Sequence, residues 1–180
     1  MSATLLDAVL RPRAVAVVGA SSDPSKRGHQ AVRALMESTY DGRVYPVNPR
    51  GGSLLGLEVH ASLDALPGPA DLALVCTPAA TAAEVVAACG RAGIPAAVLL
   101  AVGFGESGEA GEALERAVAD AAREYGVRVV GPNTSGLMNL SVGLNLIGAR
   151  GVRRGHLGLL VQSGNLALNL MLDAGRRSGG

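Results

Sequence analysis

Short apolar segments alternate with helix-like patterns along most of this chain. Two of the segments, Ala73-Leu74-Val75-Cys76 and Ala97-Val98-Leu99-Leu100, are apolar on both faces, as central strands of a parallel sheet are. The alternation predicts an α/β fold with a doubly wound, mostly parallel, Rossmann-like sheet that carries helices on both faces. The expected strands are Ala14–Gly19, Arg43–Val47, Leu72–Thr77, Ala96–Val102 and Val127–Val130, and the expected helices are Gln30–Ser38, Thr81–Ala92 and Glu109–Tyr125, with a short helix or turn at Ser62–Leu66.

A second unit is expected near the end of the chain. Leu157–Val161 is predicted to be a further strand, and an amphipathic stretch, Leu166–Ala174, follows it. A single strand and helix cannot bury their own apolar faces. We therefore expect residues 1–150 to form one ligand-binding domain and residues 151–180 to begin a second, truncated α/β domain; the simpler alternative is an extra strand and helix of the first domain. The apolar face of Leu166–Ala174 predicts a protein contact, with absent domains or with a second copy in a homo-oligomer.

Small and polar residues follow every predicted strand of the sheet. In open α/β sheets the ligand binds beyond the carboxyl ends of the strands, where the strand order reverses. The segments at these ends are Gly19–Gly28, Asn48–Gly52, Thr77-Pro78, Gly103–Glu106 and Gly131-Pro132-Asn133. One shared crevice explains this grouping better than five independent loops.

The loop after the first strand has the composition of an anion-binding site. Gly19 and Gly28 permit a close backbone approach, and the loop between them supplies serine hydroxyls. The helix that follows directs its positive end toward the same place. Lys26 is the single lysine of a chain with 15 arginines, which places a compact ammonium where a phosphate would bind.

The pattern differs from that of an NAD-binding fold. Such folds carry G-x-G-x-x-G after the first strand and an acidic residue at the end of the second. Here the next glycine after Gly19 is Gly28, and the second strand ends in Asn48-Pro49-Arg50. Arg50 suits a phosphorylated ribose. Two ligands fit these residues: NADP with its 2′-phosphate, or coenzyme A with its 3′-phosphate.

Composition excludes several other classes of function. The net charge of +1 disfavours binding of duplex nucleic acid, and one Phe, three Tyr and no Trp leave few stacking platforms for single strands. No apolar run is long enough for a membrane span, and a signal peptide is not evident, so we expect a cytoplasmic protein without a membrane partner. Cys76 and Cys89 form no metal-binding or disulfide pattern. The sequence also has no nucleophile–base arrangement of a hydrolase.

Six motifs in series resemble the CoA-binding domain of NDP-forming acyl-CoA synthetases, relatives of the succinyl-CoA synthetase α subunit. The matching segments are Leu10–Ser21, Tyr45–Pro49, Asp71–Val75, Gly103–Glu106, Gly131–Asn133 and, at the start of the family's second domain, Gln162–Gly164. The resemblance covers nearly the whole chain. It implies that residues 1–150 bind CoA and that the parent protein is an acid–thiol ligase, which converts acyl-CoA, NDP and phosphate to the acid, CoA and NTP through an acyl phosphate and a phosphohistidine.

The resemblance also implies which residues bind the cofactor. The first loop would hold the nucleotide end of CoA, the residues after the second strand would border the adenosine, and the later strand ends would line the pantetheine arm and guide the thiol toward Asn133. Ser163 and Gly164 match positions whose backbone N–H groups bind the phosphohistidine. The CoA-binding residues implied are Gly19, Ala20, Ser21, Ser22, Lys26, Gly28, Val47, Asn48, Pro49, Arg50, Thr77, Pro78, Gly103, Phe104, Glu106 and Asn133.

Two departures from the family pattern limit what this chain can do. Thr134 stands where the succinyl-CoA branch has a cysteine after Gly-Pro-Asn, so the acyl substrate is expected to differ. The phosphorylated histidine of the family lies downstream of residue 180, so we assign no catalytic residue here and expect CoA binding without turnover. The resemblance implies partners in the missing domains or an ATP-grasp subunit. Alternatives are a regulatory CoA-sensing module of a protein acetyltransferase and an NADP-binding oxidoreductase domain.

The histidines and one carboxylate have ordinary structural interpretations. His29 is expected to be a partly exposed residue at a helix start, with contact to a phosphate as the alternative, and His60 and His156 are expected in solvated turns. Glu106 has two interpretations, orientation of a ligand and capping of the following helix.

Overall fold

The computed structural model describes residues 4–177, so the ends of both predicted domain ranges, residues 1–3 and 178–180, lie outside it. Five parallel strands form the main sheet in the order β2-β1-β5-β6-β7. Their bounds are β1 Ala14–Val18, β2 Arg43–Val47, β5 Leu72–Val75, β6 Ala96–Leu99 and β7 Arg128–Val130. Every predicted strand of the first domain is present, which confirms the α/β fold class.

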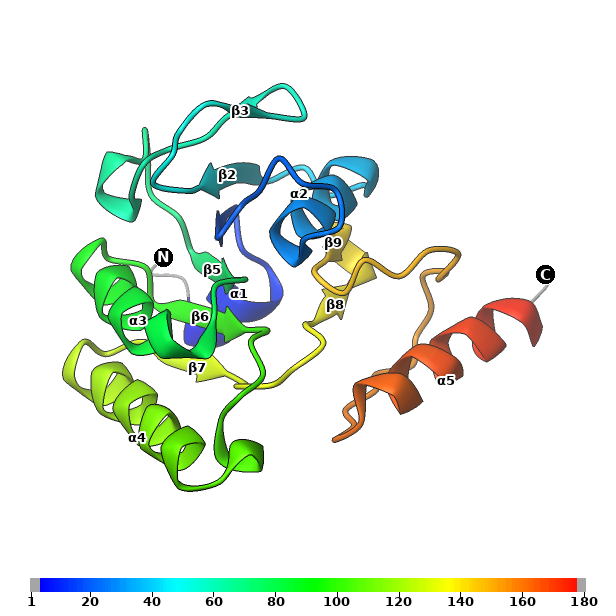
Figure 1. The fold of residues 1–180 in the computed structure, drawn as a ribbon. Helices are drawn as coiled ribbons and strands as arrows, with labels where there is room; N and C mark the ends of the chain where they lie inside the picture. Colours follow the sequence, from blue (N-terminus) through cyan, green and yellow to red (C-terminus); the bar gives the residue numbers. More distant parts are fainter. Residues whose placement is uncertain (1–3, 178–180) are drawn as a thin grey trace.

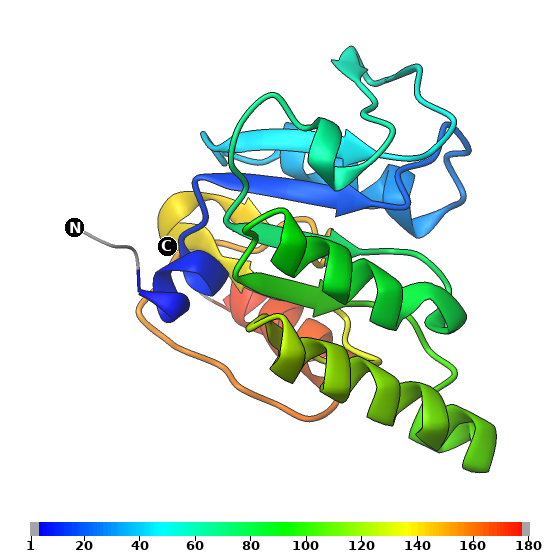
Figure 2. The same cartoon turned by 90° about the vertical axis from the view of Figure 1, so that its left-hand side faces the viewer.

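Helices cover both faces of this sheet (Figures 1 and 2). Successive strand residues point to opposite faces, so Ala16 packs with the cluster that contains Val86 and Val118, whereas Val17 packs with the cluster that contains Val32 and Leu144. The first face is covered by α3 (Ala82–Arg91) and α4 (Glu109–Glu124). The second face is covered by α1 (Leu5–Leu10), α2 (Arg27–Glu37) and the hairpin of β8 (Met138–Asn139) and β9 (Leu144–Asn145).

The strand order reverses between β1 and β5. The chain passes from β1 to β2 on one side and then returns to β5 on the other side of β1. The loops after β1 and β5 therefore leave the sheet in opposite directions and a crevice opens between them. This is the place where the sequence predicts the ligand.

Several short elements were not predicted from the sequence. The hairpin of β3 (Ser53–Leu54) and β4 (Leu57–Glu58) follows β2, and α1 begins with a capping box in which Thr4 and Asp7 exchange hydrogen bonds. Each is too short to show a clear hydrophobic period. The 3₁₀ turns are η1 Leu63–Ala65, inside the predicted short helix, η2 Ala79–Thr81, η3 Gly105–Ser107 and η4 Leu140–Val142.

The predicted strand at Leu157–Val161 is wrong for this chain. The segment is irregular, and Leu157 and Leu160 are 88% and 100% exposed. A strand needs a neighbour that completes its backbone hydrogen bonds, and no other strand pairs with this segment within residues 4–177. The helix that follows, α5 (Gly164–Arg177), is present and lies apart from the main sheet (Figure 1).

Candidate functional site

A cavity of about 620 Å³ lies where β1, β2 and β5 end. Its walls come from the loop after β1, the first turn of α2 and the residues that follow β2 and β5. The lining residues are Gly19, Ser21, Lys26, Arg27, Gly28, Asn48, Pro49, Arg50, Cys76 and Pro78. Most of them were predicted from the sequence; Arg27 and Cys76 were not.

Two glycines allow α2 to begin directly on the end of β1. Gly19 has φ +86°, and a Cβ there would lie 3.0 Å from the Thr77 side chain. A Cβ on Gly28 would overlap the carbonyl oxygen of Gly19 and lie 3.0 Å from the Cα of Ala20. Side chains at these positions would push the helix away from the strand, so both glycines shape the cavity.

The amino-terminal end of α2 lacks the usual compensation for its positive partial charge. Lys26 is its N-cap residue and makes no side-chain capping hydrogen bond, and the first turn holds no acidic residue. α1 differs, because Thr4 and Asp7 cap it. An N-terminus with free N–H groups and cationic side chains favours a bound anion.

Hydrogen bonds within the β1–α2 loop fix its shape. Asp23 accepts hydrogen bonds from the backbone N–H of Ser25 (2.9 Å) and from its hydroxyl (2.7 Å), and the Asp23 N–H donates to Ser21 Oγ. The bonds from Ser25, together with nearby Lys26, hold the pKa of Asp23 below its usual value. The residues of this loop thus hold one another in place through hydrogen bonds internal to the loop.

Asn48 joins the end of β2 to the end of β1. Its Nδ2 donates to the carbonyl oxygen of Ala20 at 2.6 Å, and its Oδ1 accepts from the backbone N–H of Arg50 at 3.0 Å. Arg50 thereby lies at the rim of the cavity. It also lines an adjoining recess of about 70 Å³ with Ser22 and Gly51.

The residues after β5 supply an unpaired hydroxyl and a thiol. The Oγ1 of Thr77 is buried and has no hydrogen-bond partner among the described residues, and its methyl group lies against Gly19. A buried polar atom without a partner is costly, but Thr77 itself is not among the residues that line the cavity of 620 Å³. Burial raises the pKa of the Cys76 thiol to about 12, although Arg27 acts to lower it, so this thiol stays protonated near neutral pH.

The predicted residues after β6 serve the loop itself. Phe104 is fully buried in the core, so its side chain does not line the cavity. Glu106 Oε1 accepts a hydrogen bond from the Gly103 N–H at 2.6 Å, and this bond, with others from nearby backbone N–H groups, lowers the pKa of Glu106. The carboxylate is thus occupied in the loop ahead of α4. Gly103, Phe104 and Glu106 do not line the cavity of 620 Å³.

Asn133 and the start of α5 lie near one another. Asn133 is exposed, has φ +52°, and donates its N–H to the carbonyl oxygen of Ala101. Gly164 is the first residue of α5, and a Cβ there would lie 2.8 Å from the Ser135 Cβ. Ser163 Oγ accepts a weak hydrogen bond from the Leu166 N–H at 3.4 Å. The structure therefore brings the predicted phosphate-binding residues beside the segment that follows Asn133, outside the main cavity.

Two predictions about histidines are wrong. His29 is only 8% exposed, and its Nδ1 lies 3.0 Å from the carbonyl oxygen of Ser21. His60 is 9% exposed, because it pairs with Val47 and its ring packs edge-on against Tyr45. His60 is buried by a pairing with a strand 13 residues earlier and His29 by the loop that precedes its helix, and local hydrophobic patterns reveal neither contact. His156 is exposed, as predicted.

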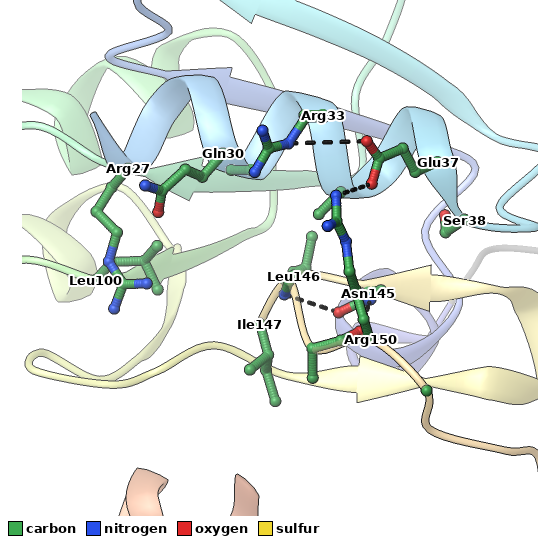
Figure 3. A pocket seen from close by; sticks show the side chains of 15 residues that line it. Arg27, Gln30, Arg33, Glu37, Ser38, Leu100, Asn145, Leu146, Ile147 and Arg150 are labelled. Carbon is green, nitrogen blue, oxygen red and sulfur yellow. Dashed lines mark hydrogen bonds and ion pairs between the residues drawn. The ribbon is translucent and has the colours of Figure 1, made fainter. Parts of the chain in front are cut away.

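A second cavity, of about 420 Å³, runs along α2 (Figure 3). The loop after β9 forms its other wall. Glu37 closes one end, because it pairs with Arg33 (3.8 Å) and Arg150 (2.8 Å). Arg27 and Leu100, the residue after β6, also line this cavity (Figure 3). Arg27 therefore belongs to both cavities.

The described residues show two further absences. Within residues 4–177, no three His, Cys, Asp or Glu side chains are grouped so as to hold a metal ion. In the same range, each helix is too short or too polar to cross a membrane.

Comparison with known proteins gives consistent matches. The family described as "CoA binding domain" matches residues 13–139. The chain is 35% identical to the α subunit of an ADP-forming acetate–CoA ligase of Pyrococcus furiosus over 167 residues, which are 93% of this chain and 36% of that protein. A second such α subunit from the same organism is 37% identical, over 92% of this chain and 37% of its own length.

A solved structure shows the same arrangement. An acetyl-coenzyme A synthetase of Ca. Korarchaeum cryptofilum, determined with phosphate and ADP, superposes with a TM-score of 0.82 at 36% identity, over 94% of this chain and 36% of that one. The chain thus spans little more than a third of the length of these relatives.

Proposed function

Because the chain belongs to the CoA-binding domain family, we propose that it binds coenzyme A in the cavity at the ends of β1, β2 and β5. The observation that carries the proposal is the set of three exposed cations, Lys26, Arg27 and Arg50, around that one cavity. Within residues 4–177, none of the three forms a salt bridge. Unpaired cations beside an uncapped helix N-terminus suit a ligand that carries several phosphate charges.

The side chains around the cavity carry groups of the kinds that bind the phosphates of coenzyme A. Hydroxyls of Ser21 and Ser22 and the ammonium of Lys26 would hold phosphates. The guanidinium of Arg50, at the rim nearest β2, would hold the 3′-phosphate. CoA supplies a thiol that accepts the acyl group.

We place this domain in an NDP-forming acyl-CoA synthetase, as the names of its relatives support. The whole reaction would need further domains or an ATP-grasp subunit, since the relatives are much longer than this chain. Ser163 and Gly164 would present the N–H groups at the start of α5 to a phosphohistidine. The adjacent Asn133 would lie where the thiol reacts.

Isothermal titration calorimetry tests CoA binding directly. We expect a dissociation constant on the order of micromolar for CoA, weaker binding of dephospho-CoA, and no saturable binding of NADPH. Arg50→Ala should remove most of the difference between CoA and dephospho-CoA. Saturable binding of NADPH without binding of CoA would contradict the proposal and favour the NADP-binding alternative.

A further inference from the structure

His29 is a buried histidine beside the proposed CoA site. It lies in the first turn of α2 and is 8% exposed. It lines neither the cavity of 620 Å³, nor the recess of 70 Å³, nor the cavity of 420 Å³ along α2. A buried polar side chain is costly unless it is hydrogen-bonded, so the role of this ring is defined by its partner inside the protein.

The ring of His29 is hydrogen-bonded to the loop that precedes its own helix. Its Nδ1 lies 3.0 Å from the carbonyl oxygen of Ser21. A carbonyl oxygen only accepts hydrogen bonds, so Nδ1 carries the hydrogen. The imidazole thereby fastens the middle of the β1–α2 loop to the first turn of α2.

This hydrogen bond orients one peptide group of the loop. The Ser21 carbonyl shares its peptide group with the N–H of Ser22, and in this trans peptide the two point in opposite directions. No described residue accepts a hydrogen bond from the Ser22 N–H, and Ser22 lines the recess beside Arg50. A Ser21 carbonyl held by His29 therefore leaves the Ser22 N–H on the side away from the ring, without a protein partner.

Two successive carbonyl oxygens of the loop are held by side-chain donors from different elements. Asn48, after β2, donates its Nδ2 to the carbonyl of Ala20, and His29, on α2, holds the carbonyl of Ser21. A carbonyl oxygen that turned toward a phosphate would repel it, because both oxygens carry negative charge. Both contacts keep these oxygens on protein donors, which favours an anion at this loop.

On the basis of the proposed function, we propose that His29 is a positioning residue of the CoA site. Its Nδ1–H holds the Ser21 carbonyl and so fixes the Ser21–Ser22 peptide in the orientation that leaves the Ser22 N–H open to coenzyme A. The role needs a hydrogen-bond donor at one place on the ring and no charge. Asparagine places its amide nitrogen near the position of histidine Nδ1, whereas glutamine places it near that of Nε2, so the two amides separate this role from burial alone.

Titration calorimetry with CoA tests the role of the ring. His29→Ala should weaken CoA binding by about three- to tenfold, the effect of one lost hydrogen bond. His29→Asn should recover most of that affinity, and His29→Gln should not. His60→Ala is the matched control, because His60 is similarly buried and its ring packs against Tyr45; it should lower the melting temperature but leave CoA affinity unchanged.

A measurement on the unchanged chain needs no substitution. A long-range proton–nitrogen NMR correlation spectrum distinguishes the two neutral forms of a histidine ring. We expect His29 to carry its hydrogen on Nδ1, with and without CoA. A hydrogen on Nε2 alone would overturn the proposal, even if every variant failed to fold.

The possible outcomes separate this inference from the proposed function. If the unchanged chain does not bind CoA, the proposed function fails. If it binds CoA and a folded His29→Ala variant binds equally well, the positioning role is overturned while CoA binding stands. Equal CoA affinities of folded His29→Asn and His29→Gln variants would also overturn it, because the place of the donor would then have no effect. Thermal unfolding without ligand checks that each variant folds.

Discussion

Gly28 shows how one residue without a side chain determines the shape of the site. The backbone of Gly19 occupies the place that its Cβ would take. The helix start, its free N–H groups and the two cations beside them are all placed by this contact. The geometry at Gly28 therefore controls ligand binding even though glycine offers no side-chain group.

Gly28→Ala should destabilise the protein by about 1–3 kcal/mol, the usual cost of forcing an atom into a packed region, and should weaken CoA binding. Urea denaturation and calorimetry measure the two effects. Gly155→Ala is a suitable control, because a Cβ there meets nothing within 4 Å and the residue has no positive φ. Equal stability of Gly28→Ala and the unchanged chain would contradict the close approach.

Asn48 is a second residue that shapes the site, in this case through its side-chain hydrogen bonds. Sequence reasoning selected it because it follows the second strand, and its place beside the cavity agrees with that. Its hydrogen bonds to Ala20 and Arg50, however, join two loops of the protein. A role in direct contact with CoA stays a prediction.

At the scale of elements, one carboxylate ties the beginnings of β1 and β5 together. Asp71 precedes β5 and accepts hydrogen bonds from the backbone N–H groups of Arg13 (2.7 Å) and Ala14 (3.2 Å), and its other oxygen pairs with the Arg13 guanidinium at 3.1 Å. Partial burial acts to raise the pKa of Asp71, but these bonds outweigh it and leave the pKa below the ordinary value of 3.8. The two central strands are thus joined at the end opposite the cavity.

The lowered pKa predicts loss of stability in acid. The folded chain binds the proton of Asp71 less readily than the unfolded chain, so this contribution is complete above about pH 4 and is lost as the pH falls through the lower, folded-state value. Asp71→Asn should cost about 1–3 kcal/mol at pH 7 and should show a smaller decrease between pH 7 and pH 3 than the unchanged chain. Urea denaturation at both pH values measures the free energy of unfolding of the two proteins. Equal decreases in this free energy from pH 7 to pH 3 would contradict the assignment to Asp71.

At the scale of the whole molecule, residues 4–150 contain both clusters of the core and all lining residues of the main cavity. The segment after residue 150 contributes α5 and exposed leucines, among them Leu166 and Leu170. Its apolar surface is only partly covered within the described chain. We interpret it as the beginning of the second domain, which stays a prediction.

A chain that ends at residue 150 should therefore fold and bind CoA within about twofold of the affinity of the full chain, a difference well below 1.4 kcal/mol. Its melting temperature should be nearly unchanged. Calorimetry and thermal unfolding of both chains give the comparison. A large loss of CoA affinity in the shorter chain would show that α5 belongs to the CoA site.

Sequence patterns alone predicted the layers, the five central strands and most of the cavity lining. It could do so because strands buried on both faces leave continuous apolar runs, and because parallel strands bring the segments after their carboxyl ends to one edge. Gly19, Lys26, Asn48 and Arg50 line the cavity, and they were predicted from this rule together with the composition of the first loop and the family resemblance.

Other features depend on contacts between distant segments, which only the folded chain brings together. Arg27 lines the site because the next residue, Gly28, lies directly against Gly19. Phe104 is buried in the cluster that also contains Val86 of α3 and Val118 of α4. Leu157–Val161 stays irregular because a strand forms only against a partner. Local periodicity records which face of an element is buried, but it cannot record which other element covers that face.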